Sequence, residues 1–94
     1  MKREIISVKV RVEGSYPSGE VVVELPNDAT LKYLLDKLGS SKHRLSEYLF
    51  DSKTGKPAVR LALVNDRSVL QQDFERVNLN DGDKVFFILP VSGG

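Results

Sequence analysis

Residues 81–94 read DGDKVFFILPVSGG, and this stretch decides the fold of the 94-residue chain. Its middle part, residues 84–89, is expected to be a β-strand that begins at a tight turn. Successive side chains of a strand point to opposite faces, and here both faces are apolar. One face carries Val85, Phe87 and Leu89, and the other carries Phe86 and Ile88. A strand of this kind either lies in the middle of a sheet or covers a site for a partner.

The residues after this strand form a different kind of segment. Pro90 lacks a backbone N–H and cannot continue the ladder. Fully extended, the last five residues reach about 17 Å, and the two glycines let them enter a narrow channel because neither carries a Cβ. A frayed terminus also favours glycine, so the diglycine alone is weak evidence for a functional tail. It becomes stronger evidence because a strand of the folded domain ends just before it. We expect a domain over residues 1–89 and a flexible tail over residues 90–94, with the carboxylate of Gly94 as its working group. The tail residues are Pro90, Val91, Ser92, Gly93 and Gly94.

Composition excludes several classes of function. The chain has no cysteine, and its 14 basic and 13 acidic residues leave a net charge of +1. Disulfides and thiolate chemistry are therefore excluded, and nothing marks a surface for nucleic acid or an anionic membrane. The single histidine, His43, has no carboxylate or cysteine at ligand spacing, so no metal site is expected. The N-terminus resembles no signal peptide, and we expect one cytoplasmic domain.

Two alternating segments open the chain. Residues 5–12 place four β-branched residues on one face, and residues 20–25 alternate in the same way. Turn residues fill the segment between them, which predicts an antiparallel hairpin. We expect Lys9 and Arg11 on its wet face to lie near Glu20 and Glu24 and to pair with them across the strands, rather than to form a binding patch.

A helix is expected next. Four leucines recur at helical spacing, at positions 31, 34, 35 and 38. Asp28 and Thr30 are candidate N-caps, and Gly39 is the expected stop. Burying the four leucines would contribute about 6–12 kcal/mol before conformational entropy is counted. The stripe must face the inward valines of the hairpin.

The middle of the chain predicts shorter elements. A short second helix is expected within residues 40–50, and residues 51–57 form a loop whose Thr-Gly-Lys lacks the spacing of a phosphate-binding loop. A third strand is expected over residues 59–65, followed by a turn at residues 65–67 and a brief strand at residues 69–70. Residues 71–80 show no regular pattern, and their apolar anchors are Phe74, Val77 and Leu79.

Together these elements predict an α+β fold of the β-grasp (ubiquitin-like) type, with a mixed sheet of four to five strands wrapped around one main helix. The last strand belongs in the middle of that sheet because both of its faces are apolar. The first strand is its natural neighbour, and this pairing would be parallel if the helix covers one face.

This element order resembles that of the MoaD/ThiS sulfur-carrier proteins. The resemblance rests on the Leu79-Asn80-Asp81-Gly82-Asp83 turn, the aromatic strand after it and the Pro-Val-Ser-Gly-Gly ending, and it spans essentially the whole chain. Within the group the match is to the molybdopterin synthase small subunit and its archaeal ubiquitin-like relatives. Thiamine-pathway carriers look less similar because they are shorter and lack residues 40–57. Two dipeptides depart from the family pattern: Asn65-Asp66 stands where Asn-Gly is common, and Leu89-Pro90 replaces a frequent Pro-Pro.

The resemblance implies a mechanism in which the chain is not itself catalytic. An E1-like adenylyltransferase (MoeB-like) would use ATP to adenylate the Gly94 carboxylate, and persulfide sulfur would displace AMP to leave a thiocarboxylate. The tail would then enter the molybdopterin synthase large subunit (MoaE-like) and deliver sulfur for the molybdenum or tungsten cofactor. The chain itself is expected to bind no cofactor.

Under this interpretation, a partner would dock beside the tail. Phe86 and Ile88, together with Leu63 or Leu61, would form an exposed apolar patch for that contact. The alternative is that the second helix or residues 40–57 cover these side chains as a satellite core.

Two other functions stay open. Activated Gly94 could be joined to lysines of target proteins, which would make the chain a ubiquitin-like modifier. A function of another class is a passive ubiquitin-like binding module whose tail does no chemistry.

Overall fold

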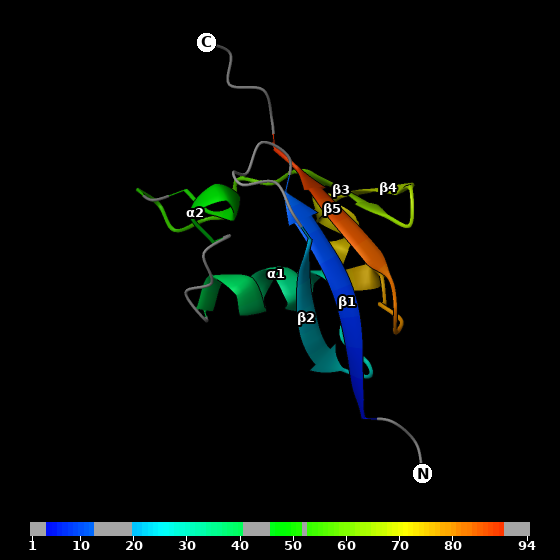
Figure 1. The fold of residues 1–94 in the computed structure, drawn as a ribbon. Coiled ribbons are helices and arrows are strands. Elements are labelled where there is room, and N and C mark those ends of the chain that lie inside the picture. The colour runs from blue at the N-terminus through cyan, green and yellow to red at the C-terminus, as the bar shows by residue number, and fades with distance from the viewer. Residues whose placement is uncertain (1–3, 13–19, 41–45, 52, 90–94) are drawn as a thin grey trace.

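The computed structural model describes residues 4–12, 20–40, 46–51 and 53–89 (Figure 1). Five strands form one sheet in the order β2-β1-β5-β3-β4. Their bounds are β1 Ile5–Val12, β2 Val21–Pro26, β3 Leu61–Val64, β4 Arg67–Leu70 and β5 Lys84–Ile88. The helices are α1 Leu31–Ser40, the short α2 Ser46–Leu49 and the 3-10 helix η1 Gln71–Arg76. This is the predicted mixed sheet with one main helix.

The central position of β5 confirms the interpretation of residues 84–89. It pairs in parallel with β1 and antiparallel with β3, so it has a neighbour on each side. Val85 and Phe87 are fully buried on one face, whereas Phe86 and Ile88 lie half-buried on the other. The strand is apolar on both faces because one face forms the core and the other contributes to a surface patch.

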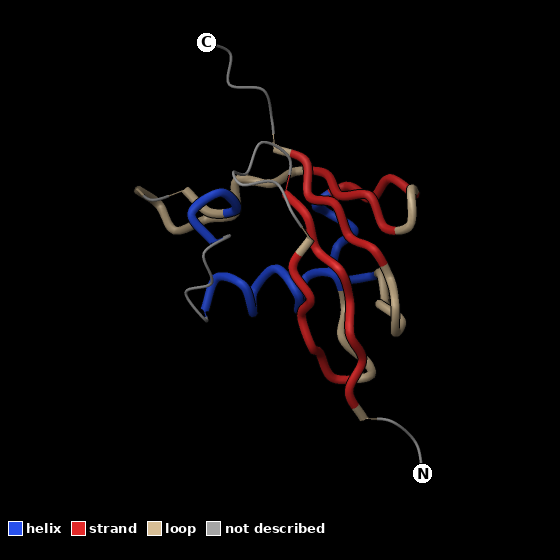
Figure 2. Tube along the Cα trace, in the orientation of Figure 1, coloured by secondary structure: helices blue, strands red, loops and turns tan. Residues whose placement is uncertain are grey.

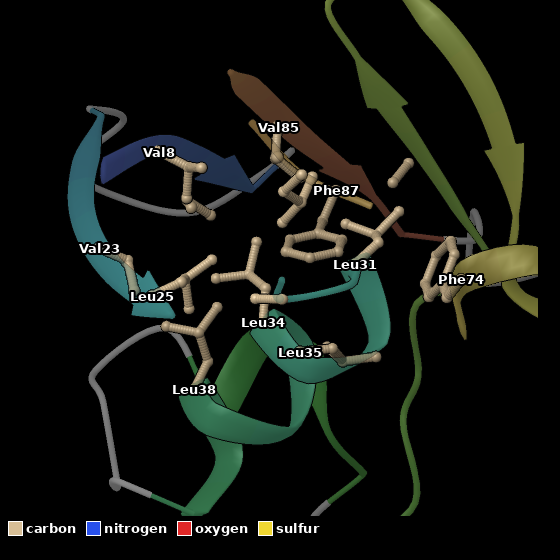
Figure 3. Close-up of a cluster of buried hydrophobic side chains, with 14 of the residues drawn as sticks. Val8, Val23, Leu25, Leu31, Leu34, Leu35, Leu38, Phe74, Val85 and Phe87 are labelled. Carbon is tan, nitrogen blue, oxygen red and sulfur yellow. The ribbon is translucent and has the colours of Figure 1, made fainter. Parts of the chain in front are cut away.

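Helix α1 covers the core face of the sheet and runs across the strands rather than along them (Figures 1 and 2). Its four leucines are buried among side chains of the sheet, including Val8, Val85 and Phe87 (Figure 3). The backbone N–H of Tyr33 donates to Thr30 Oγ1 at 3.1 Å, so Thr30 rather than Asp28 caps the helix. Near the other end, Lys37 Nζ donates to the Glu24 carbonyl at 2.8 Å and ties α1 to β2.

The expected helix stop at Gly39 is wrong, because α1 continues through Ser40. Gly39 serves instead as a point of close approach. A Cβ built there would lie 2.8 Å from two ring carbons of Phe50, the residue that follows α2. The missing side chain therefore lets the segment after α2 pack against the last turn of α1.

Two other elements differ from expectation. Strand β3 is shorter than predicted, and Val59 is fully buried without being part of it. The 3-10 helix was missed because its six residues bury a single side chain, Phe74, and one anchor leaves no period to detect. The Phe74 ring packs at a tilt against Phe87, with 6.3 Å between centroids. No helix within the described residues is long and apolar enough to cross a membrane.

Candidate docking surface on the open face of the sheet

The face of the sheet opposite α1 carries an apolar patch. In the antiparallel ladders Phe86 lies opposite Leu63, Ile88 lies opposite Leu61, and Leu61 lies opposite Leu70. Residues directly opposite one another share a face. The structure therefore brings together the side chains predicted for docking. We call Leu61, Leu63, Leu70, Phe86 and Ile88 the apolar patch.

Leu70 is the member of the patch that sequence reasoning missed. Its side chain is 54% exposed, while the other four are half-buried. Val69 points into the core at 6% exposure, so its neighbour on a strand must point outward. This alternation was the available signal, but a four-residue strand is too short for it to be noticed. The patch therefore extends from β5 across β3 to the edge strand β4.

Helix α2 does not cover the patch. Its Leu49 is fully buried in the core, and α2 packs against α1. The second helix therefore lies on the helical side of the sheet, which removes one of the two covers proposed from sequence. The role of Phe86, Ile88 and Leu63 in docking remains a prediction.

Arg11 marks the boundary between the apolar patch and a charged region. It is the register partner of Phe86 in the parallel ladder, and its guanidinium carbon lies 5.5 Å from the centroid of the Phe86 ring. A cation in this position contributes about 0.5–1 kcal/mol at exposed sites. Arg11 therefore shields part of the ring while keeping its charge in water.

The expected ion pairs across the hairpin are wrong. Lys9 lies opposite Val22, and Glu24 lies opposite Ser7. Within the described residues neither Lys9 nor Arg11 forms an ion pair. Glu20 nevertheless lies near both cations, because all three residues line one depression on the open face, but the side chains do not come within ion-pair distance.

Lys9 has a different neighbour on its other side. In the parallel ladder it lies opposite Lys84, the first residue of β5, and both side chains are exposed. We call Lys9, Arg11 and Lys84 the cationic strip. Together with Phe86 and Leu63 they line a depression of about 430 Å³ on the open face, to which Glu20 and Asp66 also contribute.

The turn at residues 65–66 and the turn at residues 80–83 hold the start of β5 in place, and with it the position of the apolar patch. Asn65 Nδ2 donates to Asp83 Oδ1 at 2.8 Å, and the Asn80 N–H donates to Asp83 Oδ2 at 2.7 Å. In return the Lys84 N–H donates to Asn65 Oδ1 at 3.0 Å. Asp83 is only 9% exposed, and each of its two carboxylate oxygens accepts one of these hydrogen bonds. We call this set of bonds the Asn65–Asp83 latch.

The turn at Asn65-Asp66 also explains one departure from the family pattern. Both residues have positive φ, 51° and 72°, as a two-residue hairpin with the twist of the flanking strands requires. Asn and Asp tolerate this left-handed region better than other side chains. The pair therefore keeps the turn geometry, and Asn65 adds the latch.

Gly82 has the same conformational requirement in the turn before β5. Its φ is 87°, and its N–H donates to the carbonyl of Ser7 at 2.7 Å. The Ser7 N–H donates in turn to Asp81 Oδ1 at 2.8 Å. These bonds join the turn to β1, so the start of β5 is held from both neighbouring strands.

The predicted reactive segment, residues 90–94 with Gly94 at its end, lies outside the described residues. The described strand β5 ends at Ile88, beside Leu61 of the apolar patch. In the part of the chain that the structure describes, no group of acidic or histidine side chains could hold a metal ion.

The fold and this surface define a β-grasp, ubiquitin-like protein. Comparison with protein families adds a specific assignment, because residues 11–94 match the ThiS family. The chain belongs to the ThiS family of ubiquitin-like sulfur carriers. Proteins of this family are in general non-catalytic and work with E1-like activating enzymes.

Two solved structures from Haloferax volcanii are similar to this one. The solution structure of the HVO 2177 protein has a TM-score of 0.72 and 26% identity, over 100% of this chain and 92% of that chain. The crystal structure of SAMP1 has a TM-score of 0.67 and 24% identity, over 94% of this chain and 99% of that chain, and this likeness shows the fold. A search of curated proteins found no match.

Proposed function

We propose that this protein carries sulfur on the carboxylate of Gly94, as the small subunit of a molybdopterin synthase. The observation that carries the proposal is the ThiS-family match over residues 11–94, a range that includes the whole tail. The apolar patch supports it, because a carrier needs a surface on which its activating enzyme and acceptor can dock. The reaction belongs to the cytoplasm, where ATP is available.

The chemistry follows from the weakness of a carboxylate as an acyl electrophile. One Gly94 oxygen attacks the α-phosphorus of ATP, pyrophosphate leaves, and the resulting acyl adenylate carries a good leaving group. The terminal sulfur of a cysteine persulfide then bonds to the carbonyl carbon as AMP departs. A thiol reduces the acyl disulfide so formed, which releases the thiocarboxylate and a mixed disulfide.

This chain contributes position rather than catalysis to those steps. Adenylation and sulfur transfer draw on groups of the activating enzyme and the persulfide donor, and the chain has no cysteine that could compete for the sulfur. In the proposed second stage the tail enters the large subunit (MoaE-like), where the thiocarboxylate gives its sulfur to a cyclic pterin precursor. The pathway could serve molybdenum or tungsten.

The molybdopterin assignment is tested by reconstitution. Thiocarboxylated protein is mixed with the synthase large subunit and a cyclic pterin precursor, and we expect dithiolene product together with return of the Gly94 carboxylate. A variant that lacks Gly94 is the control and should give none. Thiocarboxylate that stays intact with the large subunit, yet is consumed by a different acceptor, would contradict the assignment.

A ubiquitin-like modifier remains a second candidate, because the ubiquitin-like fold that the chain shares with the two Haloferax structures fits this function as well. It shares the adenylate but ends in an isopeptide bond between Gly94 and a target lysine. Peptide mapping of cellular proteins for lysines that bear the tail residues separates the two functions. If a variant lacking Gly94 kept full cellular activity, both would fail and a passive binding module would remain.

A further inference from the structure

The open face brings two lysines together without an obvious structural reason. Lys9 and Lys84 are register partners on the central strands β1 and β5, and both are exposed. Like charges on adjacent strands repel one another, weakly where both are exposed to water. Within the described residues, neither ammonium group has an ion pair or a side-chain hydrogen bond. The two ammonium groups therefore repel one another in the free protein, and a carboxylate brought between them would be attracted to both.

The surroundings of the two lysines indicate the chemistry of a ligand. Lys9, Arg11 and Lys84 line the depression with two carboxylate residues, Glu20 and Asp66, which leaves one positive charge in excess. Glu20 and Asp66 form no ion pair with these cations. The depression is continuous with the apolar patch, because Leu63 and Phe86 belong to both. A ligand for this surface would combine a carboxylate with apolar side chains.

We propose that Lys9 and Lys84 bind an Asp or Glu side chain of the E1-like activating enzyme, while adjacent apolar side chains of that enzyme cover the apolar patch. This inference rests on the proposed function. A carboxylate between the two ammonium groups would replace their repulsion with two attractive contacts. Arg11, held over Phe86, would lie at the junction of the charged and apolar contacts.

A protein segment suits this surface better than nucleic acid does. The whole chain has a net charge of only +1, whereas nucleic-acid sites are strongly basic. An apolar patch at the edge of the strip would also gain nothing from a phosphate backbone. The cationic strip is therefore expected to set the orientation and rate of docking, and the apolar patch to hold the complex together.

The test compares two double variants of the full chain against purified activating enzyme from the same organism. Lys9→Glu with Lys84→Glu, the strip variant, reverses both lysines of the strip and leaves Arg11 in place. It keeps like charges opposite one another, so its stability should stay near that of the wild type. Lys53→Glu with Lys56→Glu makes the same change in net charge in the exposed loop after α2. Thermal melting of each variant checks that the fold is unchanged.

At low salt we expect the strip variant to bind the enzyme with a dissociation constant about tenfold higher, or more, than that of the wild type. The loop variant should change this constant by less than about twofold. Between about 0.1 M and 1 M salt, where the screening length falls from about 10 Å to about 3 Å, wild-type affinity should fall and the affinity of the strip variant should not. The single variant Lys84→Glu, which places opposite charges in register, should melt no lower than the wild type and still bind weakly.

Equal binding by the strip variant and the wild type would overturn the proposal, as would equal losses in both double variants. The proposal would also fail if a single-stranded oligonucleotide displaced the enzyme from the wild-type protein and did not bind the strip variant. Adenylation of the wild type is measured in parallel. If the wild type is adenylated but the reversal has no effect, this inference alone fails; if the wild type is not adenylated, the proposed function fails.

Discussion

Phe86 and Phe87 show how adjacent residues of one strand take different roles. Phe87 is fully buried beneath α1, and Phe86 is half-buried under the guanidinium of Arg11 on the open face. A charged side chain in place of Phe87 would enter the core without a partner, whereas the same side chain in place of Phe86 can reach water.

This difference gives the first prediction. Phe86→Asp should fold, with a loss of no more than about 1–2 kcal/mol, while binding to the activating enzyme falls at least tenfold. Phe87→Asp, its neighbour on the opposite face, should lose several kcal/mol, beyond the roughly 3–5 kcal/mol of a truncated buried phenylalanine, and should not fold stably. Circular dichroism melts and a binding titration measure both quantities. If Phe86→Asp also failed to fold, Phe86 would be core and the docking surface would have to lie elsewhere.

Gly39 offers a second test at the scale of one atom. Gly39→Ala favours the helix by about 1 kcal/mol through backbone entropy, but its Cβ would meet the Phe50 ring at 2.8 Å. Overpacking of this kind costs about 1–3 kcal/mol, so we expect a net loss of stability in chemical denaturation. Phe50→Leu should remove the clash, and the double variant should be more stable than Phe50→Leu alone. A Gly39→Ala variant that is more stable than the wild type would show that the Phe50 ring gives way, so the close approach does not require glycine.

At the scale of elements, the latch between the β3–β4 turn and β5 sets the register on which the patch depends. Asn65→Ala removes the bonds to Asp83 and Lys84 and places an alanine at φ of 51°. We expect a loss of about 2–4 kcal/mol, from lost hydrogen bonds and left-handed strain together. Asn65→Gly removes the same bonds without the strain and should lose about 1–2 kcal/mol less. Equal losses in the two variants would mean that the backbone conformation contributes nothing.

The elements that could be predicted from sequence are those whose signal is local. The four leucines of α1 repeat at helical spacing, and the doubly apolar β5 indicates its own central position. The pairing of Lys9 with Lys84 could not be predicted, because register depends on loops and on strands far apart in the chain. Gly39 was misread for a similar reason, since its contact comes from Phe50 beyond the end of its own helix.

At the scale of the whole molecule, the sheet separates folding from recognition. Helix α1 closes the core face (Figures 2 and 3). The open face keeps the cationic strip on β1 and β5, beside the apolar patch on β5, β3 and β4. The apolar patch could be placed from sequence in part, through Phe86, Ile88 and Leu63. Leu70 was missed because its strand is too short for the alternation to be noticed, and the strip was missed because it depends on the pairing of β1 with β5.

The proposed chemistry takes place on a tail that partners act on, and the folded body presents that tail. One measurement tests this most directly: intact mass of the full chain after incubation with the E1-like enzyme, ATP and a persulfide donor. We predict the mass gain of one oxygen-to-sulfur exchange, assigned to Gly94 by fragmentation, and no gain without ATP or in a variant lacking Gly94. An unchanged mass with an active enzyme, or sulfur found elsewhere in the chain, would contradict the account.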